Sequence, residues 1–139
     1  TDQTYETLIA AITAAGGPEY AFFELPPENN QDGGQPGGNI RVGFLYNPVQ
    51  VNLLEETAAR VGEGDPAFDA SRKSLAADFT FGGETVTVVN NHFASKGGSS
   101  PLFGTDQPSV SSAPGEGQEY PEVNGGLTVR RGQAEAVKA

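Results

Sequence analysis

The sequence of 139 residues contains no cysteine, no methionine and no tryptophan. Without cysteine the protein has no disulfide bond, no thiolate ligand for a metal ion and no thiol nucleophile. The absence of both sulfur-containing residues limits oxidative damage, which favours an extracellular or periplasmic location. No run approaches the roughly 20 apolar residues that a membrane-spanning helix needs, so we expect no membrane partner.

Positive charge is scarce, because eight Lys and Arg residues stand against eighteen Asp and Glu residues, for a net charge of −10. Proteins that bind nucleic acid through a broad surface neutralise its phosphates with many basic side chains, so the sequence excludes that mode of binding. A phosphate group must be bound locally, or with a divalent cation that bridges it to carboxylates. The length suits one domain with a single core.

The first half of the sequence predicts one helix and several short strands. Asp2 can cap a helix whose apolar residues share one face, and Gly16-Gly17-Pro18 ends it. Residues 20–25 and 39–46 have the pattern of strands, and a loop rich in Gly, Pro and Asn separates them. We expect residues 49–54 to continue into a neighbouring strand. Residues 55–70 have no period and predict a connection with one helical turn.

The clearest local pattern is a β-hairpin. Apolar residues alternate from Leu75 to Phe81, Gly82-Gly83 supplies a two-residue turn, and residues 84–93 return as the partner strand. Residues 95–127 form a Gly/Ser/Pro-rich loop that exceeds the ~12–15 residues usual for a connection. Residues 128–139 predict the first turns of a helix.

His92 is the only histidine, and it lies at the end of the apolar run 86–93. The residues around it supply amides, a hydroxyl, an ammonium group and two glycines. A β-branched run that ends in such groups is typical of a sheet edge that delivers polar side chains to a cleft. We therefore expect the chemistry of this protein at His92.

Four short runs occur in a characteristic order, at residues 37–48, 71–75, 90–98 and 130–134. Together they resemble the endonuclease/exonuclease/phosphatase superfamily, in particular its secreted bacterial nuclease or phosphodiesterase branch. The resemblance implies an α/β fold, a four-layer α/β sandwich in which two mostly antiparallel sheets face each other and helices lie outside. It also implies hydrolysis of phosphate esters by in-line attack of water, with magnesium or manganese polarising the phosphoryl oxygens.

The resemblance also implies roles for particular residues. His92 matches the phosphate-contacting position and Asn90 matches the asparagine two residues before it, which makes these two the catalytic candidates. Arg72 matches a phosphate-binding arginine, whose planar fork can pair bidentately with phosphate oxygens. Three further phosphate-binding candidates are Asn39, Lys96 and Arg131.

Five of these six candidates also have an ordinary structural explanation. His92 can be a hydrogen-bonded histidine that caps a strand, and Arg72 can be a surface charge at a strand start. Asn39 can simply open a turn, and Lys96 and Arg131 can be solvated charges.

In the superfamily, the metal-binding asparagine and glutamate precede the opening helix, and an Asp-x-Asn strand and an Asp-His pair follow the Arg-rich helix. We therefore expect residues 1–139 to be a single partial domain without these N-terminal and C-terminal catalytic segments. Such a fragment has no metal ligands of its own and is inactive alone. Its exposed sheet edges favour oligomerisation or pairing with the missing parts of its own domain.

The alternative hypothesis is a non-enzymatic, acidic secreted module that binds calcium or a protein partner through its long loops. Residues 28–33 have the oxygen chemistry that calcium prefers, but they lack the full ligand set of an EF-hand loop. The phosphoesterase hypothesis leaves the substrate open between nucleic acid and a small phosphodiester, because specificity loops vary on one scaffold.

Overall fold

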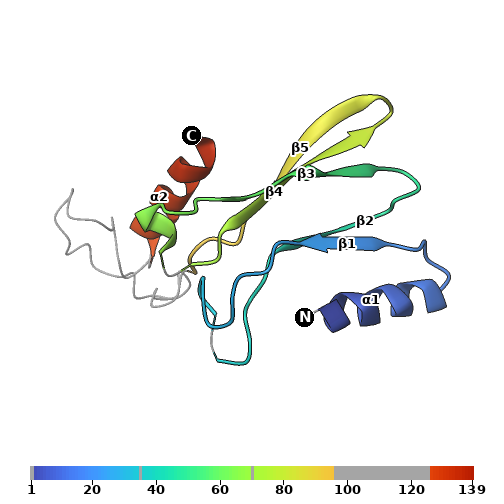
Figure 1. Cartoon of the computed structure of the whole chain (residues 1–139), viewed down its shortest axis with the longest axis horizontal. Helices are drawn as coiled ribbons and strands as arrows, with labels where there is room; N and C mark the ends of the chain where they lie inside the picture. Colours follow the sequence, from blue (N-terminus) through green and yellow to red (C-terminus); the bar gives the residue numbers. More distant parts are fainter. Residues whose placement is uncertain (1, 35, 70, 96–125) are drawn as a thin grey trace, which may run out of the picture.

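The computed structural model describes residues 2–34, 36–69, 71–95 and 126–139. The described chain contains two α-helices, one short 3-10 helix (η1) and five strands (Figure 1). In chain order these are α1 (Asp2–Ala14), β1 (Ala21–Glu24), β2 (Gly43–Tyr46), β3 (Asn52–Val61), η1 (Pro66–Phe68), β4 (Ser74–Phe81), β5 (Glu84–Asn90) and α2 (Leu127–Lys138). The predicted opening and closing helices are both present. Most of the predicted loop 95–127 lies outside the described residues.

The strands form two antiparallel sheets, one of order β1-β2 and one of order β3-β4-β5. The mixed α/β class is therefore confirmed, while the four-layer sandwich stays a prediction. The β4-β5 hairpin is also confirmed: Gly82 and Gly83 adopt φ values of 60° and 89°, which glycine reaches without strain. Strand β5 ends at Asn90, so His92 lies just after the strand and not within it.

The prediction for residues 55–61 was wrong, because β3 continues through them to Val61. The pairing of β3 with β4 shifts between Leu54 and Ala59, and such a bulge breaks the alternation by which a strand is recognised. At the bulge, the Thr57 hydroxyl donates to the Leu54 carbonyl at 2.7 Å and accepts from the Asp78 amide at 2.8 Å. The predicted helical turn is present as η1. Strand β2 is shorter than the predicted range 39–46.

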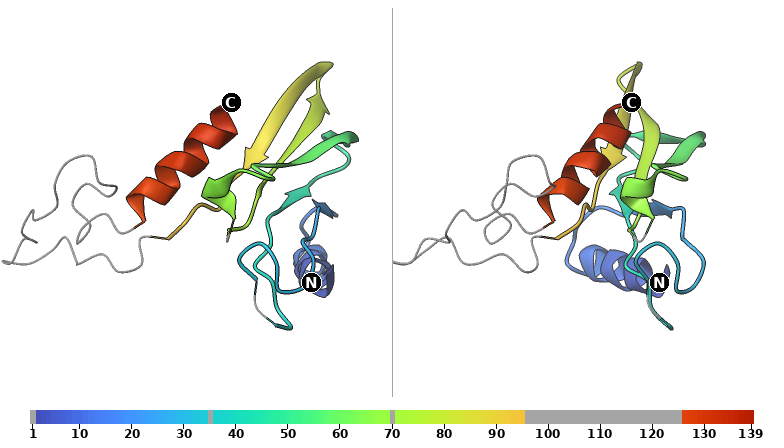
Figure 2. Two further views of the ribbon diagram at one scale, coloured as in Figure 1. Left: turned by 60° about the vertical axis from the view of Figure 1, so that its left-hand side comes forward. Right: turned by 90° about the vertical axis from the view of Figure 1, so that its left-hand side faces the viewer.

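The two sheets form two layers (Figures 1 and 2). Apolar side chains from both sheets pack together between them. Phe79 of β4 lies at their centre, with ring centroids 5.3 Å from Phe44 and 5.6 Å from Tyr46 of β2, both edge-on. Leu75 and Ala77 of β4 are each 1% exposed. These residues alternate along β4 because successive strand side chains point to opposite faces, so one face supplies the core.

The helices attach to opposite parts of this sandwich. Tyr5 of α1 stacks on Phe22 of β1 at 4.7 Å, and burial, reinforced by the negative charge of Glu24, raises the pKa of the Tyr5 hydroxyl. Helix α2 packs on η1, around the fully buried Phe68. Within the described part of the chain, no helix is long and apolar enough to cross a membrane.

Candidate anion-binding site

The segment that carries His92 is fixed from three directions. Before it, the Asn90 side-chain nitrogen donates to the Gly43 carbonyl of β2 at 2.8 Å. After it, the Ala94 amide donates to the side-chain oxygen of Gln133 in α2 at 2.8 Å. Between them, Phe93 packs against Phe68 of η1 with ring centroids 6.2 Å apart. The exposed imidazole of His92 is thus presented from an anchored backbone.

Arg72 and His92 interact, although twenty positions of sequence separate them. Partial burial and then the positive charge of Arg72 lower the pKa of the His92 imidazole below its ordinary value. The turn that carries Arg72 and the end of β5 are tied together because the Ser74 hydroxyl donates to the Asn91 side-chain oxygen at 2.6 Å. The structure therefore brings together two of the residues that the resemblance assigns to phosphate.

Arg72 has an unused donor. Its Nε atom is buried and has no hydrogen-bond partner in the described structure. A buried donor without a partner costs about 1–3 kcal/mol, which an anion at this position would offset. Arg72 lines a small pocket together with three other cations and one carboxylate, namely Arg41, Arg60, Lys73 and Asp32.

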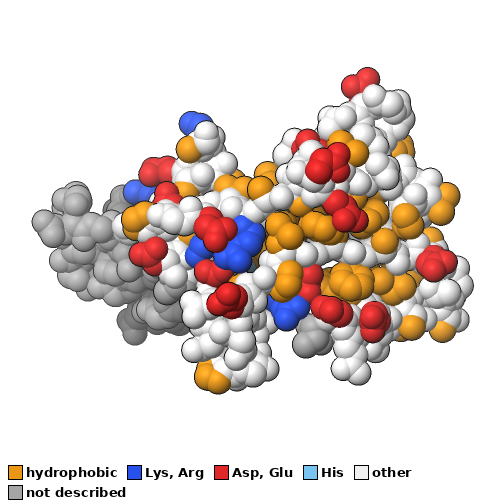
Figure 3. Space-filling model, viewed as in Figure 1, with side chains coloured by type: hydrophobic (Ala, Val, Ile, Leu, Met, Phe, Trp, Pro, Cys, Tyr) orange, Lys and Arg blue, Asp and Glu red, His pale blue; other side chains and the backbone are white. Residues whose placement is uncertain are grey.

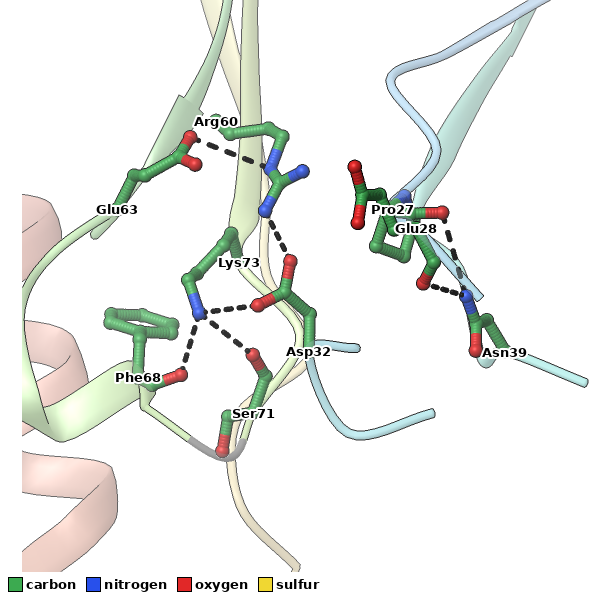
Figure 4. A network of polar contacts seen from close by, with 9 residues as sticks. All are labelled: Pro27, Glu28, Asp32, Asn39, Arg60, Glu63, Phe68, Ser71 and Lys73. Carbon is green, nitrogen blue, oxygen red and sulfur yellow. Dashed lines mark hydrogen bonds and ion pairs between the residues drawn. The ribbon is translucent and has the colours of Figure 1, made fainter. Parts of the chain in front are cut away.

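The other three cations of this pocket are already paired with carboxylates. Arg41 contacts Glu24 at 2.6 Å, and both Arg60 and Lys73 contact Asp32 (Figure 4). Arg72 has no carboxylate partner among the described residues. In a protein with a net charge of −10, this leaves one guanidinium group whose charge is available to a ligand at the pocket.

Lys73 fixes the turn that carries Arg72. Its side chain is 8% exposed, and its ammonium group donates to Asp32 at 2.7 Å, to the Phe68 carbonyl at 2.7 Å and to the Ser71 carbonyl at 3.3 Å (Figure 4). All three donors of the ammonium group are therefore used within the protein. Lys73 therefore holds the backbone just before Arg72, and Arg72 is the cation left to bind a ligand.

Asn39 lies in the loop between β1 and β2. Its side-chain nitrogen donates to the Glu28 carbonyl at 2.8 Å and its side-chain oxygen accepts from the Asn30 amide at 3.1 Å. These bonds close the loop, as in the ordinary reading of an asparagine at a turn. The two loops meet at Asp32, which binds Lys73. A phosphate-binding role for Asn39 stays a prediction.

The remaining candidate residues differ in their surroundings. Asn90 lies next to the site, but its side-chain nitrogen is used in the bond to Gly43. Arg131 is an exposed residue of α2 that has interactions of its own within the protein. Lys96 lies outside the described residues.

Sequence reasoning missed Gln133 as a residue of the site. It is fully buried, and its amide binds two separate segments: the side-chain nitrogen donates to the Ala67 carbonyl at 3.1 Å, and the oxygen accepts from Ala94. A glutamine inside an amphipathic helix does not stand out in a sequence. Its two hydrogen-bond partners could not be predicted, because both are distant along the chain. Its only sequence signal was its position in the Arg-rich run.

Metal binding finds no support in the side chains that the structure describes. Among residues 2–34, 36–69, 71–95 and 126–139, no three His, Cys, Asp or Glu side chains come together as metal ligands. In the calcium-like segment 28–33, the Asp32 carboxylate binds Arg60 and Lys73 instead. The described residues thus do not fit a magnesium, manganese or calcium ion.

Comparison of the chain with protein-family models, with curated proteins and with solved structures gave no match in any of the three. The assignment to the superfamily therefore stays a prediction, carried by the sequence runs described above.

Proposed function

We propose that the chain is the central part of a secreted, metal-dependent phosphoesterase, a nuclease or phosphodiesterase, and that Arg72 and His92 bind the phosphate group of its substrate. The observation that carries this proposal is the buried Arg72 Nε without a hydrogen-bond partner, on a guanidinium group whose charge acts on the only imidazole of the chain. Both groups favour an oxyanion: a guanidinium fork pairs with two phosphate oxygens, and an imidazole N–H donates to one.

His92 and Arg72 have different tasks in this proposal. Arg72 carries a permanent charge that neutralises the phosphate, since a guanidinium group stays protonated at any physiological pH. His92, whose pKa is lowered, is largely neutral at pH 7 and donates a hydrogen bond from its protonated nitrogen. Asn90 supports the strand end that carries His92 through its bond to Gly43.

In this proposal the metal ion binds only in the complete domain, because the described residues do not supply its ligands. A bound magnesium or manganese ion would polarise the phosphoryl oxygens and orient water for in-line attack. The chain alone binds and orients the phosphate, and we expect no hydrolysis from it. In a longer chain that carries the metal ligands, His92→Ala should reduce kcat/KM at least about tenfold, as removal of a fixed oxyanion donor does.

Calorimetric titration with inorganic phosphate and with bis(p-nitrophenyl) phosphate tests the proposal on the chain as it is. We expect Arg72→Met to weaken binding at least about tenfold, because a charge-assisted hydrogen bond contributes about 1.5–3 kcal/mol. Lys138→Met, which removes one exposed positive charge at the end of α2, is the matched control and should bind as the wild type does. Equal binding by both variants, or no binding by the wild type, would overturn the proposal.

The same titration with calcium examines the alternative of a non-enzymatic calcium-binding module. A calorimetric signal with calcium and none with either phosphate compound would favour that module. Binding of both phosphate compounds without calcium favours the phosphoesterase.

A further inference from the structure

Half of the positively charged side chains of this acidic protein lie at one pocket. Of the eight Lys and Arg residues in the sequence, four line the pocket of the candidate phosphate site: Arg41, Arg60, Arg72 and Lys73. On the face that Figure 3 draws, a group of Lys and Arg side chains lies left of centre, with acidic side chains directly against it. Positive charge that is scarce in the sequence is thus concentrated at this pocket, which favours an anionic ligand.

Four carboxylates balance these cations, but unequally. Glu24 and Asp32 are largely buried beside them, at 5% and 15% exposure. Asp2 and Glu63 are mostly exposed and lie at the longer distances of 3.6 and 3.7 Å, so solvent screens their charge. Of the four, Asp32 is the one that contacts two cations at once. The Asp32 carboxylate therefore marks a position in the pocket that suits an anion.

The two cations at this position, Arg60 and Lys73, are held by more than Asp32. Arg60 belongs to β3, in the part of the strand that pairs with β4. The Lys73 ammonium group also donates to the carbonyls of Phe68 and Ser71 (Figure 4). Both positive charges therefore stay at the pocket when Asp32 leaves it.

Asp32, in contrast, belongs to a largely exposed loop between β1 and β2. Among the described residues, the hydrogen bonds of the segment 28–34 stay within this loop, except those of Asp32 to the two cations. The backbone of Asp32 has a φ of 53°, in the left-handed region that residues with a side chain disfavour. The ion pairs thus hold the loop at the pocket in an unfavourable backbone conformation, which makes Asp32 displaceable.

Space in the pocket decides which ligand displaces Asp32. The free volume is about 20 Å³, enough for one water-sized group. One oxygen of a phosphate at Arg72 fits there, but a second phosphate group needs the place of the Asp32 carboxylate. A phosphate group has more acceptor oxygens and more negative charge than a carboxylate, so it can replace Asp32 at both cations.

We propose that Asp32 occupies a second phosphate position, and that a ligand with two linked phosphate groups displaces it. The first phosphate then lies at Arg72, and the second pairs with Arg60 and Lys73. This inference rests on the proposed function, because it uses the phosphate position at Arg72. It narrows the substrate to a phosphate ester that carries a second phosphate linked to the first. A ligand with a single phosphate leaves Asp32 in place.

Calorimetric titration with pyrophosphate and with inorganic phosphate tests the inference. Asp32→Asn removes the competing charge and keeps the size of the side chain, so it should tighten pyrophosphate binding at least about tenfold. Binding of inorganic phosphate should change less than about threefold, because that anion lies at Arg72 alone. The matched control is Glu63→Gln, which removes an exposed carboxylate that contacts Arg60. It should leave the affinity for pyrophosphate within about threefold of the wild type.

Amide NMR spectra of the wild type give a readout that needs no variant. Saturating pyrophosphate should shift the amide resonances of residues 28–34, because it releases their loop from the two cations. Inorganic phosphate should leave these resonances nearly unchanged.

Two results would overturn the inference and leave the phosphate position at Arg72 intact. One is pyrophosphate that binds without moving the loop resonances. The other is Asp32→Asn that binds pyrophosphate no more tightly than Glu63→Gln does. A wild type that binds neither anion would overturn this inference together with the proposed function.

Discussion

The side-chain oxygen of Gln133 accepts a hydrogen bond from the backbone nitrogen of Ala94 at 2.8 Å, two residues after His92. The other end of the same amide donates to Ala67, so one buried side chain joins α2, η1 and the segment that carries His92. Close packing supports this contact, because a Cβ atom at Gly132 would lie only 3.1 Å from that of Ala67. The orientation of His92 thus depends on a helix more than thirty residues away in sequence.

Gln133→Leu should destabilise the protein and alter the environment of His92. The substitution leaves the Ala94 amide and the Ala67 carbonyl without their partner, at about 1–3 kcal/mol for each buried group. Urea unfolding measures the loss, and the His92 proton resonances report the change around the imidazole. Glu135→Leu, an exposed change on the same helix, should stay within about 0.5 kcal/mol of the wild type. Equal stability of the two variants would show that the Gln133 amide bonds are unimportant.

Lys73→Met should lower the free energy of unfolding by about 3–5 kcal/mol, because it removes one partner from a nearly buried ion pair. Asp32, whose side chain is 15% exposed, would keep only its contact with Arg60. Urea unfolding gives the free energy of unfolding of this variant and of Lys138→Met. Both variants lose one positive charge, so the difference between them measures the loss of the ion pair itself. A loss below about 1 kcal/mol would mean that Lys73 behaves as an exposed lysine.

Asn90→Asp and Asn91→Asp form a matched pair that tests how the end of β5 is fixed. Asn90→Asp removes the donor to the Gly43 carbonyl and should cost about 1–3 kcal/mol. Asn91→Asp keeps an oxygen that can accept from the Ser74 hydroxyl and loses only an exposed bond to the Val89 carbonyl at 3.2 Å, so its cost should stay below about 1 kcal/mol. Chemical denaturation of both variants under the same conditions gives the comparison. The reverse order of stabilities would contradict the contacts described for this strand end.

Sequence patterns predicted the elements whose signals are local. The hairpin was evident because Gly82-Gly83 separates two runs with strand periodicity, and α1 was evident from its apolar face. Strand β3 was missed from residue 55 onward because the bulge after Leu54 breaks its alternation. Local patterns could not predict which side chains join the two sheets, because contacts such as Phe44 with Phe79 link residues far apart in sequence.

The candidate site was predicted only in part, because many of its contacts also join residues far apart in sequence. The resemblance selected Arg72 and His92, and in the structure the positive charge of Arg72 contributes, after burial, to the lowered pKa of His92. It gave no indication that Asp32 and Lys73, 41 positions apart, hold the neighbouring turn. A buried ion pair across such a distance leaves no periodic trace in sequence, and neither does the double hydrogen bond of Gln133.

The lowered pKa of His92 predicts a pH dependence of stability. Folding lowers this pKa, so in the range below the unfolded value of about 6.5 the unfolded chain binds more protons than the folded protein. Stability is therefore fully present above that value and falls as the pH drops through it toward the lowered folded pKa. Urea unfolding across this window should show the decline in the wild type and a weaker one in His92→Gln. The same slope in both proteins would exclude His92 as its source.

The most direct test of the phosphate site is a proton NMR titration of His92 with and without inorganic phosphate, at constant ionic strength. Its resonances are assigned without ambiguity because His92 is the only histidine in the chain. A phosphate bound between Arg72 and His92 favours the protonated imidazole, so the account predicts that saturating phosphate raises the pKa of His92. The same pKa at every phosphate concentration would contradict the account, because no anion would then lie beside the imidazole.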